Sequence, residues 1–314
     1  MIASLTRAMI VLHLLTLAAL ALLLVKLAGL GWPAALVASA VLIALSRFGV
    51  IANNYFLSDA LRQPMADGTP APRLRLASRI VQEFWYSSLC WFRLFPFGRP
   101  FEVRIDGDAG PPVLMLHGYG SNSGFWLPLS RRLRAAGISH AAIDLEPVLA
   151  DIDDYAPRIE RAVQALCSAT GAPQVILLCH SMGGLAARAW LRAFGTARVA
   201  RVVTLGTPHF GSTLAGFGIG MNARQMLTPA GNPDSWIARL DASEDAARRS
   251  LFVSVYTRHD NIVSPQSSAV LPGASHVALD LVGHVALGFD RDVAERIEAE
   301  ISSVRQSRSR AGSR

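Results

Sequence analysis

The sequence predicts an α/β fold, a mostly parallel sheet with flanking helices, over residues 101–302. Short apolar runs alternate there with helical segments, which is the pattern of parallel strands joined by helical crossovers. One apolar run ends at Ser181 and leads directly into a helix, and two later runs end close to Asp260 and His284. Polar groups at the carboxyl ends of strands predict a ligand site at one edge of the sheet. The segment is also long enough to form one domain with its own core.

Two apolar stretches at the start of the chain predict a transmembrane helical hairpin over residues 1–60. Residues 8–30 are almost unbroken apolar sequence, and residues 34–45 begin a second run that extends toward Leu57. Each stretch approaches the ~20 residues that cross a bilayer. The alternatives are an export signal and a buried helical pair. The first stretch is long for a signal, and no convincing cleavage site follows it before the second stretch.

The distribution of basic residues predicts the orientation of this hairpin. Arg7 precedes the first stretch and several arginines border or follow the second, whereas Lys26 alone lies near the short turn. The positive-inside rule then places both ends and the following domain in the cytoplasm, as expected for a multi-pass protein of a bacterial-type inner membrane. The three scattered cysteines, Cys90, Cys167 and Cys179, form no disulfide framework and agree with a reducing compartment.

Residues 61–100 are predicted to be a linker followed by an amphipathic segment. Proline and glycine punctuate the linker at Pro64, Gly68, Pro70 and Pro72. Apolar side chains then recur at near-helical spacing, at Ala77, Ile80, Val81, Phe84, Trp91 and Phe95. This aromatic and basic helix has two interpretations of equal weight: it lies in the membrane interface, or it packs on the core of the domain.

The charge balance favours membrane lipid over nucleic acid as a partner. Lys and Arg number 30 against 23 Asp and Glu, which gives a formal net charge of +7. The basic tail at residues 303–314 is predicted to be disordered. No nucleic-acid motif or aromatic-basic stacking pattern accompanies these charges, so an anionic membrane surface fits them better.

Seven strands are expected within the domain. They are residues 101–105, 113–116, 140–144, 175–179, 199–205, 251–256 and 276–281. Residues 207–250 are too long and too glycine-rich for a plain crossover between strands, so this segment is a candidate cap over the ligand site.

The turn around Ser181 is the strongest candidate for catalytic chemistry. A serine between a strand and a helix is exposed at the sheet edge, with a helix N-terminus behind it; the alternative is an ordinary Ser-Gly turn. A serine becomes a nucleophile when an imidazole takes its proton and a carboxylate orients that imidazole. Asp260 and His284 follow in the order that such sites require, and we predict them to be the acid and the base.

Other candidates fit these roles less well. His259 precedes the acid in the chain, His276 opens its strand at the end opposite His284, and Asp280 lies inside a strand pattern. The oxyanion that forms during acyl transfer also needs donors. The sharp glycine-rich turn after residues 113–116 predicts the backbone N–H of Tyr119 as one donor, and the residue after the nucleophile, Met182, predicts the other.

Three segments resemble the bacterial lipases and esterases of the α/β-hydrolase superfamily, and the resemblance covers residues 101–299. The segments are His117-Gly118-Tyr119-Gly120, His180-Ser181-Met182-Gly183-Gly184 and Thr204-Leu205-Gly206-Thr207-Pro208-His209-Phe210-Gly211-Ser212. The resemblance implies an α/β-hydrolase fold with a small cap, and the roles of Ser181, Asp260 and His284 given above.

The chain departs from the family pattern in two places. Cys179 stands where the nucleophile pentad begins with glycine, and we interpret it as a packing residue. The residues after His284 do not supply the oxygen ligands of the calcium site that some bacterial lipases carry, so we expect no metal and no cofactor.

The predicted function is a membrane-anchored serine hydrolase that cleaves esters with a hydrophobic acyl group through an acyl-serine intermediate. An acyltransferase or thioesterase would use the same three residues, because water and an alcohol can reach the same acyl-enzyme. A catalytically silent membrane scaffold is the alternative of another class.

Overall fold

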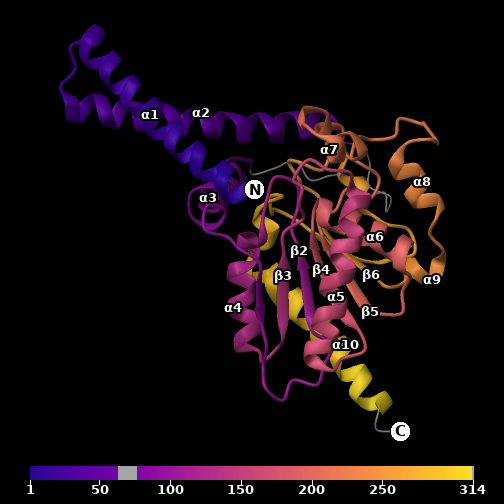
Figure 1. Cartoon of the computed structure of the whole chain (residues 1–314). Coiled ribbons are helices and arrows are strands. Elements are labelled where there is room, and N and C mark those ends of the chain that lie inside the picture. Colours follow the sequence, from indigo (N-terminus) through magenta and orange to yellow (C-terminus); the bar gives the residue numbers. More distant parts are fainter. Residues whose placement is uncertain (63–75, 313–314) are drawn as a thin grey trace.

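The computed structural model describes residues 1–62 and 76–312 of the chain, with side chains to residue 306. Most of the predicted linker, with Pro64, Gly68, Pro70 and Pro72, lies outside these ranges. Figure 1 shows a sheet with helices on both faces and two long helices that project away from it. The predicted α/β class is therefore confirmed.

The sheet has seven strands in the order β1-β3-β2-β4-β5-β6-β7. Their bounds are β1 Phe101–Val103, β2 Val113–Leu116, β3 His140–Ile143, β4 Val175–His180, β5 Val199–Leu205, β6 Phe252–Thr257 and β7 Ser275–Leu279. β1 pairs with β3 antiparallel and every other pair is parallel. All seven predicted strands are present, and their ends differ from the prediction by at most two residues.

Alternation along the strands divides the core into two layers. The helices that cover the sheet are α4 Leu127–Ala135, α5 Ala156–Thr170, α6 Met182–Phe194 and α10 Arg291–Gly312. On β2, Leu114 and Leu116 join the cluster under α5 and α6, whereas Val113 and Met115 join the cluster under α4 and α10. Successive side chains of a strand point to opposite faces, so a sheet covered on both faces needs continuous apolar runs.

The segment between β5 and β6, predicted as a candidate cap, is built from short helices. They are a 3₁₀ turn at Thr213–Phe217, α7 Met221–Gln225, α8 Trp236–Ala242 and α9 Ala246–Arg249. The segment exposes Phe217 and Ile219, which are 79% and 68% accessible. In Figure 1, α7 lies beside the end of the helix α2, Trp32–Ala60, and Leu57 of α2 and Ala223 of α7 line one cavity.

Two antiparallel helices, α1 Ile2–Ala28 and α2 Trp32–Ala60, form the N-terminal hairpin. Their most apolar stretches have mean hydropathies of 2.7 and 2.1, and only 6% and 17% of these stretches are buried. Length and composition fit a membrane span or, so near the N-terminus, an export signal. The turn end projects away from the domain, whereas the end of α2 lies over it (Figure 1).

The amphipathic segment forms α3 Leu76–Leu89, followed by a short π-helix at Cys90–Leu94. Tyr86 stacks on Phe289 of the domain with ring centroids 4.9 Å apart, whereas Trp85 is 66% exposed. The helix therefore packs on the domain on one side and offers aromatic surface on the other.

The C-terminal end of the chain differs from the prediction. A disordered tail was expected from residue 303, but α10 continues to Gly312. The sequence keeps helix-favouring residues there and offers no proline or glycine that would end the helix before Gly312.

Candidate active site

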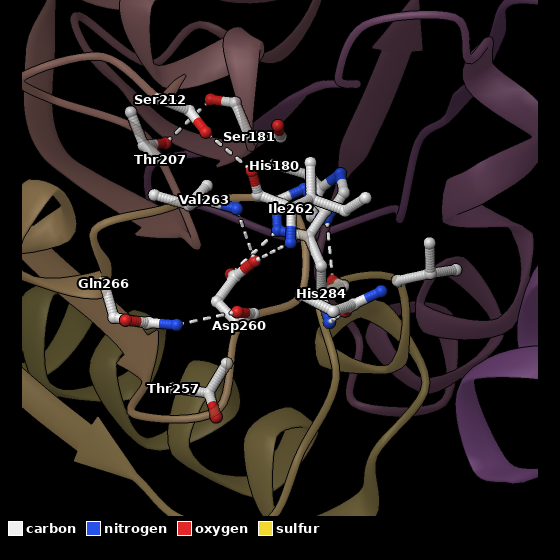
Figure 2. A network of polar contacts seen from close by, with 12 residues as sticks. His180, Ser181, Thr207, Ser212, Thr257, Asp260, Ile262, Val263, Gln266 and His284 are labelled. Atoms are coloured by element: carbon white, nitrogen blue, oxygen red, sulfur yellow. Dashed lines mark hydrogen bonds and ion pairs between the residues drawn. The ribbon is translucent and has the colours of Figure 1, made fainter. Parts of the chain in front are cut away.

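Ser181 occupies the sharp turn between β4 and α6 with φ 53° and ψ −125°. A positive φ is unfavourable for a serine, and such strain is typical of a nucleophile turn. The helix behind it can approach closely because a Cβ on Gly183 would lie 2.5 Å from the Leu116 carbonyl oxygen. Thr207 donates a hydrogen bond of 2.9 Å to the Ser181 carbonyl and so fixes the turn (Figure 2).

Cys179, the departure from the family pattern, is fully buried on β4 and belongs to the apolar cluster under α5 and α6. Burial raises the pKa of its thiol, so the thiol stays protonated and inert. The elbow conformation of Ser181 is retained beside this larger residue.

Asp260 and His284 meet at the carboxyl edge of the sheet, after β6 and β7. The Nδ1 atom of His284 lies 2.8 Å from Oδ2 of Asp260. Oδ1 of Asp260 accepts hydrogen bonds from the backbone N–H groups of Ile262 and Val263, at 2.8 and 2.7 Å (Figure 2). The carboxylate is therefore held on both oxygens, with one oxygen committed to the imidazole.

The imidazole of His284 is buried, and burial lowers its pKa because the charged form loses its hydration. The charge and hydrogen bond of Asp260, with a smaller contribution from Glu83, outweigh burial and raise the pKa above its usual value. The backbone N–H of His284 donates to Oδ1 of Asn261 at 3.0 Å. Gly206 lies beside the pair, since a Cβ there would lie 3.2 Å from both Asp260 Oδ2 and His284 Nδ1.

The rival candidates lie in other environments. His259 is buried and accepts a hydrogen bond at Nδ1 from the Leu281 N–H. His276 is bonded through Nε2 to the Leu271 carbonyl at 2.9 Å. Asp280 is exposed and accepts a hydrogen bond from Arg258. None of the three lines the cavities that contain Ser181.

His180, directly before Ser181, was not predicted to have a role in the site. Its ring stacks on Phe125 with centroids 4.3 Å apart, and its Nε2–H donates to the His284 carbonyl at 3.1 Å. Burial lowers the pKa of His180 well below the usual value, so the ring is neutral. The sequence does indicate where this side chain lies. Successive side chains of a strand point to opposite faces, so His180 and Ser181 point to opposite sides at the end of β4.

The predicted oxyanion donors lie on either side of Ser181. A Cβ on Gly118 would lie 2.9 Å from the Ser181 Cβ, so the preceding turn passes close to the nucleophile. Met182 is the first residue of α6, where the backbone N–H has no acceptor within the helix. The Tyr119 hydroxyl both donates to and accepts from the Ile219 backbone, which connects this turn to the cap.

Two cavities meet at Ser181. One of about 260 Å³ contains Ser181 and His284 and is bordered by Cys90 and Trp91 from the N-terminal region. The other, of about 370 Å³, is mainly apolar and extends under the cap. Its wall includes three residues near the end of α2, namely Asn53, Asn54 and Leu57. Ser181, Tyr119 and Ile262 line both cavities.

No metal centre accompanies these groups in the described part of the chain. Within residues 1–62 and 76–312, no three His, Cys, Asp or Glu side chains are grouped so that they could hold a metal ion.

Known proteins match this chain in its central part. A family model for the alpha/beta hydrolase fold matches residues 111–230. A triacylglycerol lipase of Burkholderia plantarii is 34% identical over 129 residues, which is 38% of this chain and 36% of the lipase. One of Pseudarthrobacter phenanthrenivorans is 34% identical over 115 residues, 34% of this chain and 35% of that lipase. The chain thus spans about a third of the length of these curated relatives.

Solved structures agree on the fold. The mature Bacillus licheniformis lipase BlEst2 superposes with a TM-score of 0.53 at 20% identity, over 61% of this chain and 93% of the lipase. Aspergillus fumigatus lipase B gives a TM-score of 0.51 at 16% identity, over 60% and 51% of the two chains. Together with the sheet order, these matches show that the chain has the α/β-hydrolase fold and that its central part is similar to lipases.

Proposed function

We propose that this protein is a membrane-anchored serine hydrolase that cleaves carboxylic esters with a hydrophobic acyl group. One observation carries the proposal: His284, which is hydrogen-bonded to Asp260, lines the same cavity as Ser181, and Ser181 is held in an elbow conformation. A buried carboxylate, an oriented imidazole and a strained serine at a sheet edge are the parts of an acyl-transfer site.

The roles follow from the chemistry of these groups. Ser181 Oγ attacks the ester carbonyl carbon while Nε2 of His284 takes the hydroxyl proton. His284 then gives this proton to the departing alcohol, which leaves an acyl-serine. Water repeats the sequence with His284 as base and releases the carboxylic acid and free Ser181. Asp260 accepts the Nδ1–H and stabilises the charged imidazolium.

The backbone N–H groups of Tyr119 and Met182 bind the oxyanion in this proposal. The N–H of Met182 is free at the start of α6, where the helix dipole also favours negative charge. Donors that are already oriented need no reorganisation when charge develops on the oxygen.

The cavity under the cap supports a hydrophobic acyl group. Its wall carries Leu214, Phe217 and Met226 from the cap and Leu57 from α2. An apolar cavity of about 370 Å³ excludes a charged acyl chain because no counter-charge lines it. The matched relatives are named triacylglycerol lipases, which agrees with an ester of this kind.

The labelling of the protein by a fluorophosphonate tests the proposed nucleophile. We expect covalent labelling of the full chain, and no labelling of Ser181→Ala. Labelling that persists in Ser181→Ala would contradict the assignment. A folded wild-type protein that neither labels nor hydrolyses esters would support the silent scaffold instead.

The membrane anchor is the second part of the proposal, and it is supported by the exposed apolar surfaces of α1 and α2. We place the domain on the cytoplasmic side because arginines flank the hairpin whereas Lys26 lies near its turn. Fusion of a fluorescent protein or an exported phosphatase after Arg99 reports the side of the membrane on which the domain lies. Fluorescence without phosphatase activity is expected; the opposite result would place the domain outside.

A further inference from the structure

Glu83 of α3 is a buried carboxylate that the hydrolase chemistry above does not use. Only 1% of this residue is exposed. Its Oε1 accepts a hydrogen bond of 2.8 Å from the Val285 N–H, and its Oε2 accepts one of 3.0 Å from the Ala286 N–H. These two N–H groups belong to the residues that directly follow His284.

The backbone is shaped to receive this carboxylate. A Cβ on Gly283 would lie 2.4 Å from Glu83 Oε2, so the residue before His284 must be glycine for the approach. Burying a carboxylate is unfavourable unless hydrogen bonds replace its water, and here two backbone donors do so. Glu83 therefore packs against Gly283, the residue before His284, and accepts hydrogen bonds from Val285 and Ala286, the two residues after it.

Ser58, near the end of α2, contacts the backbone of Asp260 in a similar way. Its hydroxyl donates to the Asp260 carbonyl at 2.6 Å and accepts from Gln266 Nε2 at 2.7 Å. Its own carbonyl accepts from the Ser264 hydroxyl at 3.3 Å. The loop that carries Asp260 is thus bound to α2 on three polar atoms.

Both contacts come from outside residues 111–230, the part that matches the hydrolase-fold model. We propose that α2 and α3 complete the catalytic centre, with Ser58 and Glu83 as positioning residues that hold Asp260 and His284 at their separation. The inference rests on the proposed function, because it assigns Asp260 and His284 to the triad. Neither Ser58 nor Glu83 lines the cavity beside the reacting hydroxyl.

The charge of Glu83 also acts on the imidazole. The groups that face His284 are Asp260, His180 and Glu83, and both carboxylates raise the pKa of His284. Glu83 itself faces the side chains of Tyr55 on α2 and Cys90 in the π-helix. Burial raises the pKa of Glu83, and the two backbone hydrogen bonds oppose that rise.

The test compares Glu83→Gln with wild type in the full chain, with p-nitrophenyl butyrate as substrate. Glutamine keeps the shape and one acceptor but loses the charge and the second acceptor. We expect kcat to fall by about 100-fold because the imidazole shifts, while KM changes by less than about threefold. The acid limb of the kcat/KM profile should move to lower pH, because an attraction that favours the imidazolium is lost.

Ser58→Ala is the second variant, and we expect about a tenfold loss of kcat from one removed hydrogen bond. Ser46→Ala on the same helix and Glu295→Gln on α10 are matched controls at exposed sites, and both should behave as wild type. Melting temperatures measured in parallel show whether each variant is folded at the assay temperature.

Two outcomes would overturn the inference. One is a lower melting temperature for Glu83→Gln with unchanged kcat and unchanged pH profile, which is the result for a residue that only stabilises the fold. The other is an equal loss of kcat in the exposed controls. If Ser181→Ala also kept its activity, the proposed function would fail as well; if Ser181→Ala were inactive, the positioning roles alone would be wrong.

Discussion

Arg188 of α6 and Glu244 of the cap segment form an ion pair in which both side chains are fully buried. Nε and Nη2 of the guanidinium each lie 2.8 Å from one carboxylate oxygen. A third donor, Nη1, binds the His209 carbonyl at 2.7 Å. The helix that begins after Ser181 is therefore bound directly to the cap segment.

Replacement of Arg188 by Met should destabilise the protein by about 3 kcal/mol, because the buried carboxylate of Glu244 would lose two hydrogen bonds and keep only Arg249, whose Nε lies 3.5 Å from its Oε2. Thermal unfolding in the detergent-solubilised full chain measures this. Arg239→Met on the exposed face of α8 is the control and should cost about 0.5 kcal/mol or less. Equal effects of the two changes would show that the buried pair is not special.

Substitution of Ser181 or His284 by alanine should lower kcat against a p-nitrophenyl ester by roughly 10⁴-fold or more. The double variant should have a kcat little lower than that of either single variant. When two residues act in one catalytic unit, removing either abolishes the effect of both on kcat. Non-additive losses of kcat are therefore the diagnostic result. His276→Ala should retain most activity, since His276 bonds to the Leu271 carbonyl away from the cavities. Wild-type turnover by Ser181→Ala would exclude this triad.

The pH dependence of kcat/KM should report the raised pKa of His284. The base works as the neutral imidazole, so activity is absent below this pKa and rises as pH increases through it. We expect the midpoint above the value of about 6.5 for a free imidazole. Asp260→Asn removes the attraction that favours the imidazolium, so the midpoint should move to lower pH while kcat falls by roughly 10⁴-fold. A midpoint that did not move would mean that Asp260 is not the partner.

Cys179→Ala and Cys179→Gly should remain active, because the thiol packs in the core and lines neither cavity. The alanine variant should lose about 1 kcal/mol of stability from the small void that it leaves. Activity and melting temperature are both measured, so that a folded but inactive variant can be recognised. Such a variant would show that the thiol takes part in the chemistry.

Leu57→Trp should narrow the cavity under the cap, because Leu57 forms part of its wall. We expect kcat/KM for p-nitrophenyl dodecanoate to fall about tenfold relative to p-nitrophenyl acetate, in line with the energies of lost methylene contacts. Leu57→Met conserves volume and should leave the ratio unchanged. A ratio that is the same in all three proteins would place the acyl chain elsewhere.

Local patterns in the sequence predicted most of the fold. Continuous apolar runs such as Val113–Leu116 mark strands that are covered on both faces. Asp260 and His284 were predicted because they follow strand-like runs, and they lie 2.8 Å apart. These signals depend on neighbours along the chain, which a single sequence displays directly.

The contributions of Ser58 and Glu83 were not predicted. Ser58 meets Asp260 across 202 residues, and Glu83 meets Val285 across the same distance in sequence. Glu83 is not among the apolar side chains that recur at helical spacing in this segment, and a charged residue at such a position is usually solvated. Only the tertiary packing of α3 against the chain around His284 buries it.

The uninterrupted helix α2 connects the proposed membrane span directly to the loop of Asp260. Its rise of about 1.5 Å per residue places Ser58 roughly 16 Å further along the axis than Arg47, the cation that closes the most apolar part of the helix. In the proposed membrane-anchored form, this helix fixes the distance along its axis between the apolar span and the loop that carries Asp260. Inserting or deleting a turn between Arg47 and Asn53 would change that distance by ~5.4 Å.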